Sequence, residues 1–120
     1  MAVRAIRGAI QLDSDERSHL LKSTAELVTK VLHANGLDTT DLISIWFTAT
    51  PDVKSEFPAL AARELGLGDV PLMCSVEMDV QGAMPRVIRL MMHADTTLSR
   101  NEIQHVYLRG AAALRTDLAQ

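Results

Sequence analysis

The sequence predicts one α/β (α+β) domain with two layers, in which one long helix and one or two short helices cover a mixed β-sheet. Its 120 residues fall near the commonest size of a single domain and suffice to bury a hydrophobic core. Apolar residues alternate with a period of two in several short runs, and a longer run between the first two has a helical period instead. The expected order of elements is β-α-β-α-β-β-(α)-β, and no linker or repeat divides residues 1–120.

The N-terminal half of the chain is expected to form a strand, a long helix and a second strand. Strands are expected at 3–12 and 43–50, where apolar residues alternate with others. Between them, apolar residues recur at helical spacing over 13–34, which is typical of an amphipathic helix. Asp13 and Glu16 have the spacing of a capping box, so we expect Asp13 to cap this helix.

The C-terminal half is expected to add two short helices and three strands. The dipeptide Phe57-Pro58 opens the first of these helices, because proline suits the first helical position. A Ser-x-x-Glu pattern begins the second. The helices are expected at 57–65 and 99–102, and the strands at 70–76, 86–94 and 105–109. We expect residues 116–120 to form a mobile tail.

The composition argues against several classes of protein. The net charge is -3 and no block of Lys or Arg occurs, which argues against nucleic acid as a partner. No run of 18 apolar residues occurs, so no membrane-spanning segment is expected. Cys74 is the one cysteine, which excludes an intramolecular disulfide. We therefore expect a soluble, cytoplasmic protein without a signal peptide.

Two arginines lie on predicted strand faces that are otherwise apolar. Arg7 shares its face of the first strand with small apolar residues, and Arg89 shares its face of the fourth strand with Val87 and Met91. A guanidinium group among apolar side chains costs free energy unless it has an anionic partner. Glu77, at the end of the preceding strand, is one candidate partner, and a carboxylate of a ligand is another. The pair is therefore either a structural ion pair or part of an anion-binding site.

The usual catalytic and cofactor-binding motifs do not occur in this chain. There is no nucleophile elbow, phosphate-binding loop or dinucleotide fingerprint. The four histidines lack metal-ligand spacing, and the single cysteine offers no thiolate cluster. We therefore predict no metal site and no cofactor. Cations and one carboxylate suit few reactions, and the unimolecular rearrangement of a dianion is one of them.

A set of short segments, in a fixed order and spacing, covers almost the whole chain. These segments are RAIRGA at 4–9, TATPD at 48–52, FPALAAREL at 57–65, residues 70–79, residues 85–92, HVYL at 105–108 and the dipeptide Leu114-Arg115. The opening segment is weak by itself, but the combination is specific. With these segments the chain resembles the monofunctional, trimeric α/β-type chorismate mutases.

The resemblance implies a homotrimer whose sheets form a pseudo-α/β barrel, with active sites in the clefts between subunits. It implies the conversion of chorismate to prephenate without a cofactor. By the match of motifs, Arg7, Arg89 and Tyr107 bind the carboxylates and the ether oxygen, while Glu77 and Cys74 lie at the ring hydroxyl. Arg89, Glu77 and Arg7 are the expected catalytic residues. The remaining expected substrate-binding residues line the pocket or its entrance: Phe57, Ala59, Leu72, Met73, Leu114, Arg63 and Arg115.

Three positions depart from the pattern of the family. Leu60 stands where some relatives carry a lysine, and Met73 replaces a smaller polar residue. Thr116 stands in place of a proline in the tail. None of these changes affects the expected catalytic residues, so we expect activity to be intact and the affinity for substrate to differ.

The sequence leaves two other functions as alternatives. One is a trimeric module that binds a small metabolite, or has a regulatory role, and catalyses nothing. The other is a trimeric enamine or imine deaminase of similar architecture. Incubation with chorismate separates them, because only a chorismate mutase converts it to prephenate.

Overall fold

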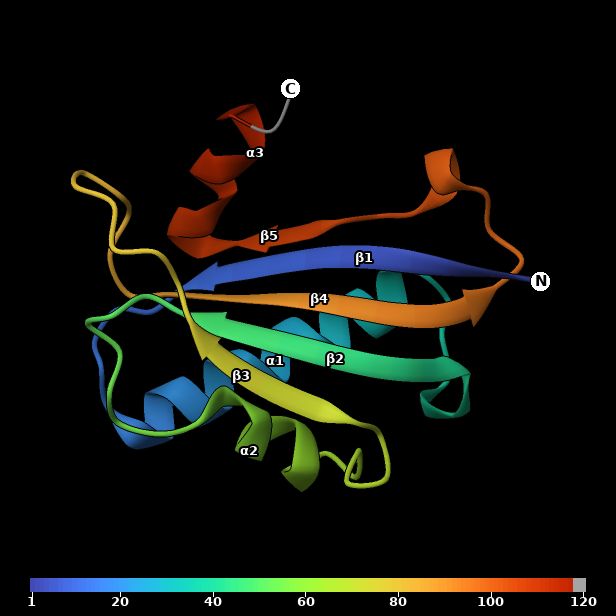
Figure 1. Ribbon diagram of the computed structural model, residues 1–120, viewed down its shortest axis with the longest axis horizontal. Coiled ribbons are helices and arrows are strands. Elements are labelled where there is room, and N and C mark those ends of the chain that lie inside the picture. Colours follow the sequence, from blue (N-terminus) through green and yellow to red (C-terminus); the bar gives the residue numbers. More distant parts are fainter. Residues whose placement is uncertain (118–120) are drawn as a thin grey trace.

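The alternating apolar segments pair into one mixed β-sheet. Within residues 1–117, which the computed structural model describes, this sheet has five strands in the order β3-β2-β4-β1-β5 (Figure 1). Their bounds are β1 Ala2–Gln11, β2 Leu42–Ala49, β3 Leu72–Val76, β4 Val87–Thr96 and β5 Val106–Leu108. Strand β4 pairs antiparallel with β1 and β2, whereas β2–β3 and β1–β5 are parallel pairs. The predicted mixed sheet is confirmed.

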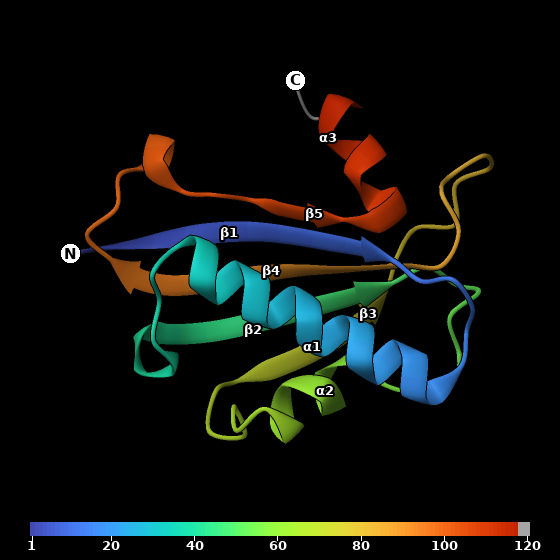
Figure 2. The same ribbon diagram turned by 180° about the vertical axis from the view of Figure 1, so that it is seen from behind.

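The helices leave one face of the sheet open. The α-helices are α1 Arg17–Ala34, α2 Pro58–Glu64 and α3 Leu114–Asp117, and 3-10 turns occur at Thr39–Asp41, Arg100–Glu102 and Arg109–Ala113. Figure 2 shows α1 lying across one face of the sheet, with α2 beside it next to β3. Neither α1 nor α2 covers the opposite face, which we call the open face. Among the described residues, only the turn Arg109–Ala113 and the start of α3 pack over part of it, beside Ala9 and Val87. None of these helices is both long enough and apolar enough to cross a membrane.

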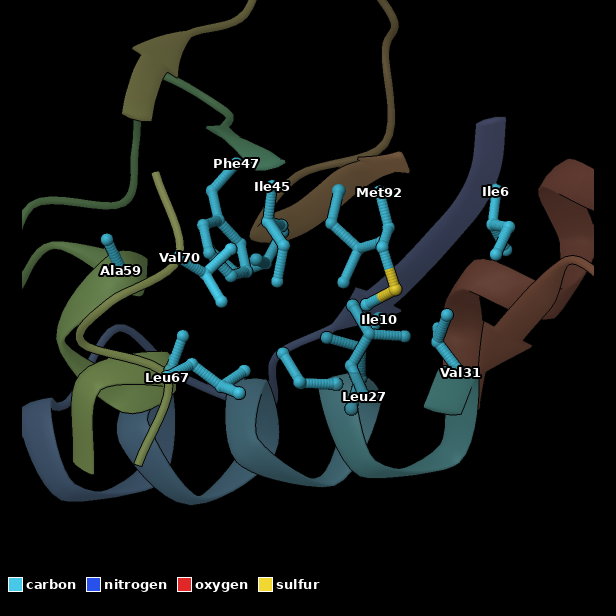
Figure 3. Close-up of a cluster of buried hydrophobic side chains, with 14 of the residues drawn as sticks. Ile6, Ile10, Leu27, Val31, Ile45, Phe47, Ala59, Leu67, Val70 and Met92 are labelled. Atoms are coloured by element: carbon cyan, nitrogen blue, oxygen red, sulfur yellow. The ribbon is translucent and has the colours of Figure 1, made fainter. Parts of the chain in front are cut away.

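The hydrophobic core lies between the sheet and α1. Figure 3 shows side chains of β1, β2 and β4 pointing toward the helix, and the buried residues include Ile6, Ile10, Ile45, Phe47, Met92, Leu27 and Val31. Gly8 of β1 faces the side chains of α1. A Cβ atom at this position would lie 3.1 Å from Val31 and 3.2 Å from Leu27, which explains the glycine. The two-layer prediction is therefore confirmed, with a core of aliphatic residues and one phenylalanine.

The predicted cap of the long helix was wrong. Glu16 caps α1, because its carboxylate accepts hydrogen bonds from the backbone N–H groups of Ser18 at 3.2 Å and His19 at 2.9 Å. These hydrogen bonds, with the one from His19 first, lower the pKa of Glu16. Asp13 instead donates its backbone N–H to Nε2 of His19 at 3.0 Å. The longer side chain of Glu16 reaches two free N–H groups at the helix start, so the helix begins at Arg17.

Two arginines end up outside the strands predicted for them. Arg86 has a φ of 55°, so β4 starts at Val87 and not one residue earlier. Its N–H donates to the Asp52 carboxylate at 3.0 Å, and its Nε donates to the carbonyl of Leu12 at 3.0 Å. Arg109 has a φ of 54° and begins a 3-10 turn after β5. The left-handed backbone conformation ends pleated pairing at both positions.

The second strand contains an irregularity that the alternation pattern did not reveal. The register of β2 against β4 shifts between Leu42 and Ser44, as in a β-bulge. The alternation predicted that Ile43 joins Ile45 and Phe47 in the core. Because of the bulge, Ile43 is instead 40% exposed. Of the tail predicted to be mobile, residues 116 and 117 continue α3, and residues 118–120 lie outside the described residues.

Candidate active site

Neighbouring strands bring a row of residues together on the open face. Thr48 of β2 pairs with Arg89 of β4, Arg89 pairs with Ala9 of β1, and Ala9 pairs with Tyr107 of β5. Directly paired residues on adjacent strands present their side chains to the same face of a sheet. Arg7 precedes Ala9 by two residues and lies on that face as well. The tertiary structure thus gathers four chain segments into one surface.

These side chains line a cavity of about 310 Å³. Its walls include Arg7, Ala9, Trp46, Thr48, Arg89 and Tyr107. This volume is within the range of small-molecule sites. The cavity combines two guanidinium groups and one phenol with an otherwise mostly apolar wall, which suits a small molecule that carries negative charge. Three of the residues predicted from the sequence, Arg7, Arg89 and Tyr107, are brought together here.

Glu77 is the anionic partner of Arg89. The Nε of Arg89 donates to both carboxylate oxygens of Glu77, at 3.2 Å to Oε1 and 3.1 Å to Oε2. The hydroxyl of Thr48 donates to Oε2 at 2.6 Å, and the N–H of Glu77 donates to the carbonyl of Ala49 at 2.9 Å. Among residues 1–117, nothing accepts a hydrogen bond from Nη1 or Nη2 of Arg89. The end of the guanidinium group is therefore available to a ligand.

Arg7 contributes a second available cation. Its guanidinium forms no hydrogen bond or ion pair with the described residues, while its backbone N–H donates to Nδ1 of His105 at 2.9 Å. Burial lowers the pKa of His105, and the nearby cations of Arg7 and Arg115 lower it further. His105 is therefore a neutral imidazole that carries its proton on Nε2 and accepts through Nδ1. The backbone of Arg7 is fixed in this way, and its side chain remains free to bind an anion.

Phe57 and Cys74 line a different cavity, of about 370 Å³, between the end of β3 and the segment before α2. Phe57 is 69% exposed. Burial raises the pKa of the Cys74 thiol, against the opposing effects of a hydrogen bond from the backbone of Ala59 and of the Arg63 cation. The thiol is therefore neutral near pH 7 and serves as a hydrogen-bonding group, not as a nucleophile.

The other predicted residues of α2 and β3 occupy the same edge of the sheet. The side chain of Ala59 is 3% exposed and packs into the main core, and Leu72 packs against that core from β3. Met73 is 57% exposed and lines a third cavity, of about 320 Å³, beside Trp46. We call this set the edge group, and its members are Phe57, Ala59, Arg63, Leu72, Met73 and Cys74.

The remaining predicted residues belong to the open face and the tail. Leu114 packs on a small cluster formed by Ala9, Val87 and Ala111, with Tyr107 against the same cluster. Arg115 is exposed and lies close enough to His105 to affect its pKa. We call this set the face group, and its members are Arg7, Glu77, Arg89, Tyr107, Leu114 and Arg115. Within one chain, Arg7, Arg89 and Tyr107 of the face group line one cavity, whereas Phe57 and Cys74 of the edge group line another.

Among the residues of the first cavity that sequence reasoning missed, two have hydrogen-bonding side chains, Thr48 and Trp46. The alternation along 43–50 placed both opposite the buried Phe47, but neither was assigned a role. Trp46 donates its indole N–H to the hydroxyl of Ser75 on β3. No signal in the sequence identifies Thr48, because its position beside Arg89 follows from the strand register. In the described part of the chain, no three His, Cys, Asp or Glu side chains gather as metal ligands.

Comparisons with known proteins all point to one family. The family model described as chorismate mutase type I matches residues 3–118. The chorismate mutase AroH of Thermus thermophilus is 44% identical over 117 residues, which cover 97% of this chain and 96% of that protein. The chorismate mutase AroH of Bacillus subtilis (strain 168) is 39% identical over 120 residues, which cover 99% of this chain and 94% of that protein. The solved structure of a chorismate mutase from Clostridium thermocellum matches with a TM-score of 0.90 and 41% identity, covering 92% of this chain and 98% of that one. The chain belongs to the type I chorismate mutase family.

Proposed function

We propose that this protein is an isomerase that converts chorismate to prephenate, the step that leads toward phenylalanine and tyrosine. Membership of the family and the names of the similar proteins support this activity. The observation that carries the proposal is the hydrogen bonding of the Arg89 guanidinium. Its Nε is held by Glu77 in a preformed cavity, and its terminal nitrogens have no partner among the described residues.

The chemistry of the substrate fits this set of residues. Chorismate has two carboxylates, an ether oxygen and a hydroxyl, and its rearrangement breaks a C–O bond and forms a C–C bond within one molecule. No proton has to move, so no general acid or base is needed. The protein has to hold the compact conformer in which the two reacting carbons meet, and to stabilise the negative charge that grows on the ether oxygen.

Each charged residue of the face group has a role in this mechanism. Arg7 binds a substrate carboxylate through its free guanidinium, and Tyr107 adds a hydroxyl donor. Arg89 presents Nη1 or Nη2 to the ether oxygen as the C–O bond breaks. Its charge is permanent, so no proton is lost when the negative charge develops. Glu77 keeps the guanidinium oriented and favours the positive character that remains near the ring.

We further propose that the complete site forms between subunits of a homotrimer. Residues of the face group line one cavity within the chain and Phe57 and Cys74 of the edge group line another, and a cleft between subunits would unite the two groups. The open face exposes large apolar side chains, with Trp46 at 49%, Met73 at 57% and Met91 at 38%. Exposed apolar surface of this kind favours association. In this arrangement the sheets line a pseudo-α/β barrel and α1 lies outside.

The edge group would supply the other wall of the cleft. Phe57 is exposed and can cover the substrate ring, while the neutral thiol of Cys74 can hydrogen-bond to the ring hydroxyl. Arg63 adds a cation near the entrance, with no partner among the residues described. We propose that this assembly works in the cytoplasm, where the free thiol of Cys74 stays reduced.

The activity is tested by incubating the protein with chorismate and following the loss of its ultraviolet absorbance, with prephenate identified as the product. Turnover supports the proposal. Binding of chorismate without turnover would favour a metabolite-binding module, and turnover of enamines or imines instead would favour a deaminase.

The shared cleft is tested by mixing two inactive variants. Arg89→Ala damages the face group and Arg63→Ala damages the edge group. When the two variants are unfolded and refolded together, random assembly should leave about a quarter of the clefts with both groups intact. Recovery of activity on mixing, with a mass of three times 13.1 kDa by sedimentation, supports the trimer. A monomer with full activity would rule it out.

A further inference from the structure

We infer that Thr48 is a positioning residue, which fixes the carboxylate of Glu77 and thereby the guanidinium of Arg89. This inference rests on the proposed function, because it concerns how that site is held ready. Thr48 belongs to none of the sequence-predicted site residues. It lies on β2, between the strand that carries Arg89 and the strand that leads to Glu77.

The backbone around Thr48 is paired with a strand on each side. Thr48 pairs with Arg89 on one side of β2 and with Ser75 of β3 on the other. Glu77 follows the end of β3, and its N–H continues the pairing by donating to the carbonyl of Ala49. We call Thr48, Glu77 and Arg89 the clamp. Thr48 and Arg89 lie in adjacent strands, and Glu77 is held directly after β3 by its hydrogen bond to Ala49. The distance from Thr48 to Glu77 is fixed by strand register and not by a flexible loop.

The hydrogen bond from Thr48 restricts rotation of the Glu77 carboxylate, which the contact with Arg89 alone does not prevent. Arg89 contacts Glu77 through Nε alone, at 3.2 Å and 3.1 Å, and one nitrogen shared between two oxygens does not fix the carboxylate plane. The hydroxyl of Thr48 donates to Oε2 at 2.6 Å, the length of a hydrogen bond to a charged acceptor. A β-branched threonine is also stiff at χ1, so the hydroxyl is held in place.

This clamp has a consequence for the reaction. If Glu77 rotates, Arg89 can turn to pair through its terminal nitrogens, which are then no longer free for the substrate. Thr48 therefore keeps Glu77 on Nε and the terminal nitrogens available. The substrate carboxylate bound by Arg7 is not affected, so the loss of Thr48 should lower kcat more than it raises KM.

The test compares three variants on the same face of β2. Thr48→Val keeps the shape and removes the donor, and we expect kcat to fall about tenfold, with KM close to normal. Thr48→Ser keeps the hydroxyl and should recover most of that rate. Ser44→Ala removes a hydroxyl that bonds to no described residue, and should leave kcat unchanged. Circular dichroism melts and sedimentation on the same preparations establish that each variant is folded and assembled.

A second comparison separates positioning from a structural role. In a Glu77→Ala background there is no carboxylate to hold, so adding Thr48→Val should cause no further loss of kcat. If Thr48→Val lowered kcat by the same factor in both backgrounds, the inference would be overturned. A normal kcat for Thr48→Val would overturn it as well. If Glu77→Ala itself had a normal kcat, the proposed role of Glu77 would fail and this inference with it. A slow Glu77→Ala beside a normal Thr48→Val would overturn the inference about Thr48 alone.

Discussion

The Arg89 guanidinium is the group whose removal tests the proposed reaction most directly. Arg89→Ala removes a contact that strengthens only as the C–O bond breaks, so the loss should appear in kcat. A preorganised neutral donor of this kind contributes roughly 3–4 kcal/mol, which is a factor of about 10² to 10³ in rate. A full charge should contribute more, so we expect kcat to fall by at least about 10³.

The same substitution should change the stability of the fold much less. The side chain of Arg89 is 40% exposed and that of Glu77 is 16% exposed, so solvent screens the pair and its contribution is on the order of 1 kcal/mol. Thr48 still donates to Glu77 after the arginine is removed. A loss of about 1 kcal/mol lowers Tm by only about 4 °C in a domain of this size. Partial unfolding therefore cannot account for the expected loss of rate.

Two further substitutions separate the charge of Arg89 from its shape. Arg89 uses Nε for Glu77 and leaves its other two nitrogens for a ligand. A lysine at this position has a single nitrogen that must serve both, so Arg89→Lys should recover part of the rate and not all. Arg89→Gln retains a donor without the charge, and should be slower than Arg89→Lys.

The assay combines two measurements on each preparation. Loss of chorismate absorbance gives kcat, and circular dichroism melts give Tm. Glu26→Gln is a control, because it breaks the 3.0 Å ion pair between Glu26 and Arg109, whose arginine is about as exposed as Arg89 and which lies outside the cavity. This control should leave kcat unchanged. A folded Arg89→Ala protein with near-normal kcat would refute the electrostatic mechanism and leave the pair with Glu77 as a structural contact.

The other predictions concern pH, the thiol and the packing of the core. Because no proton is transferred, kcat should be nearly flat between roughly pH 6 and 9, and a bell-shaped profile in folded protein would contradict this. Cys74→Ser should keep most of the activity, since burial raises the pKa of the thiol and keeps it neutral; complete loss in a folded variant would show that the sulfur has another role. Burial lowers the pKa of His105, so the unfolded chain binds its proton more readily, and stability should decrease as the pH falls below about 6.5. His105→Asn keeps an acceptor for the N–H of Arg7, so its Tm should differ less between acidic and neutral pH, and an unchanged difference would exclude His105 as the cause. Gly8→Ala would place a Cβ 3.1 Å from Val31 and should lower the free energy of unfolding by about 1–3 kcal/mol, whereas an unchanged urea midpoint would show that α1 moves freely to make room.

Local patterns in the sequence were sufficient to predict the layers and part of the site. Alternation with a period of two predicted the strands, and the helical period between the first two predicted α1. The same alternation placed Arg7 and Arg89 on apolar faces, and both line the cavity of the open face. These features could be predicted because, within a regular strand, side chains alternate between the two faces of the sheet.

Other features depend on contacts between segments that are distant in the sequence, and they become evident only from the three-dimensional fold. The role of Thr48 follows from its pairing with Arg89 and its hydrogen bond to Glu77, which join residues of three chain segments. Arg86 leaves the predicted strand because Asp52 and Leu12 hold it in a left-handed conformation. Periodicity states which face a residue takes on its own strand, but it does not state which residue lies opposite on the next one. Strand register supplies that information, and it is set by the packing of the whole sheet against α1.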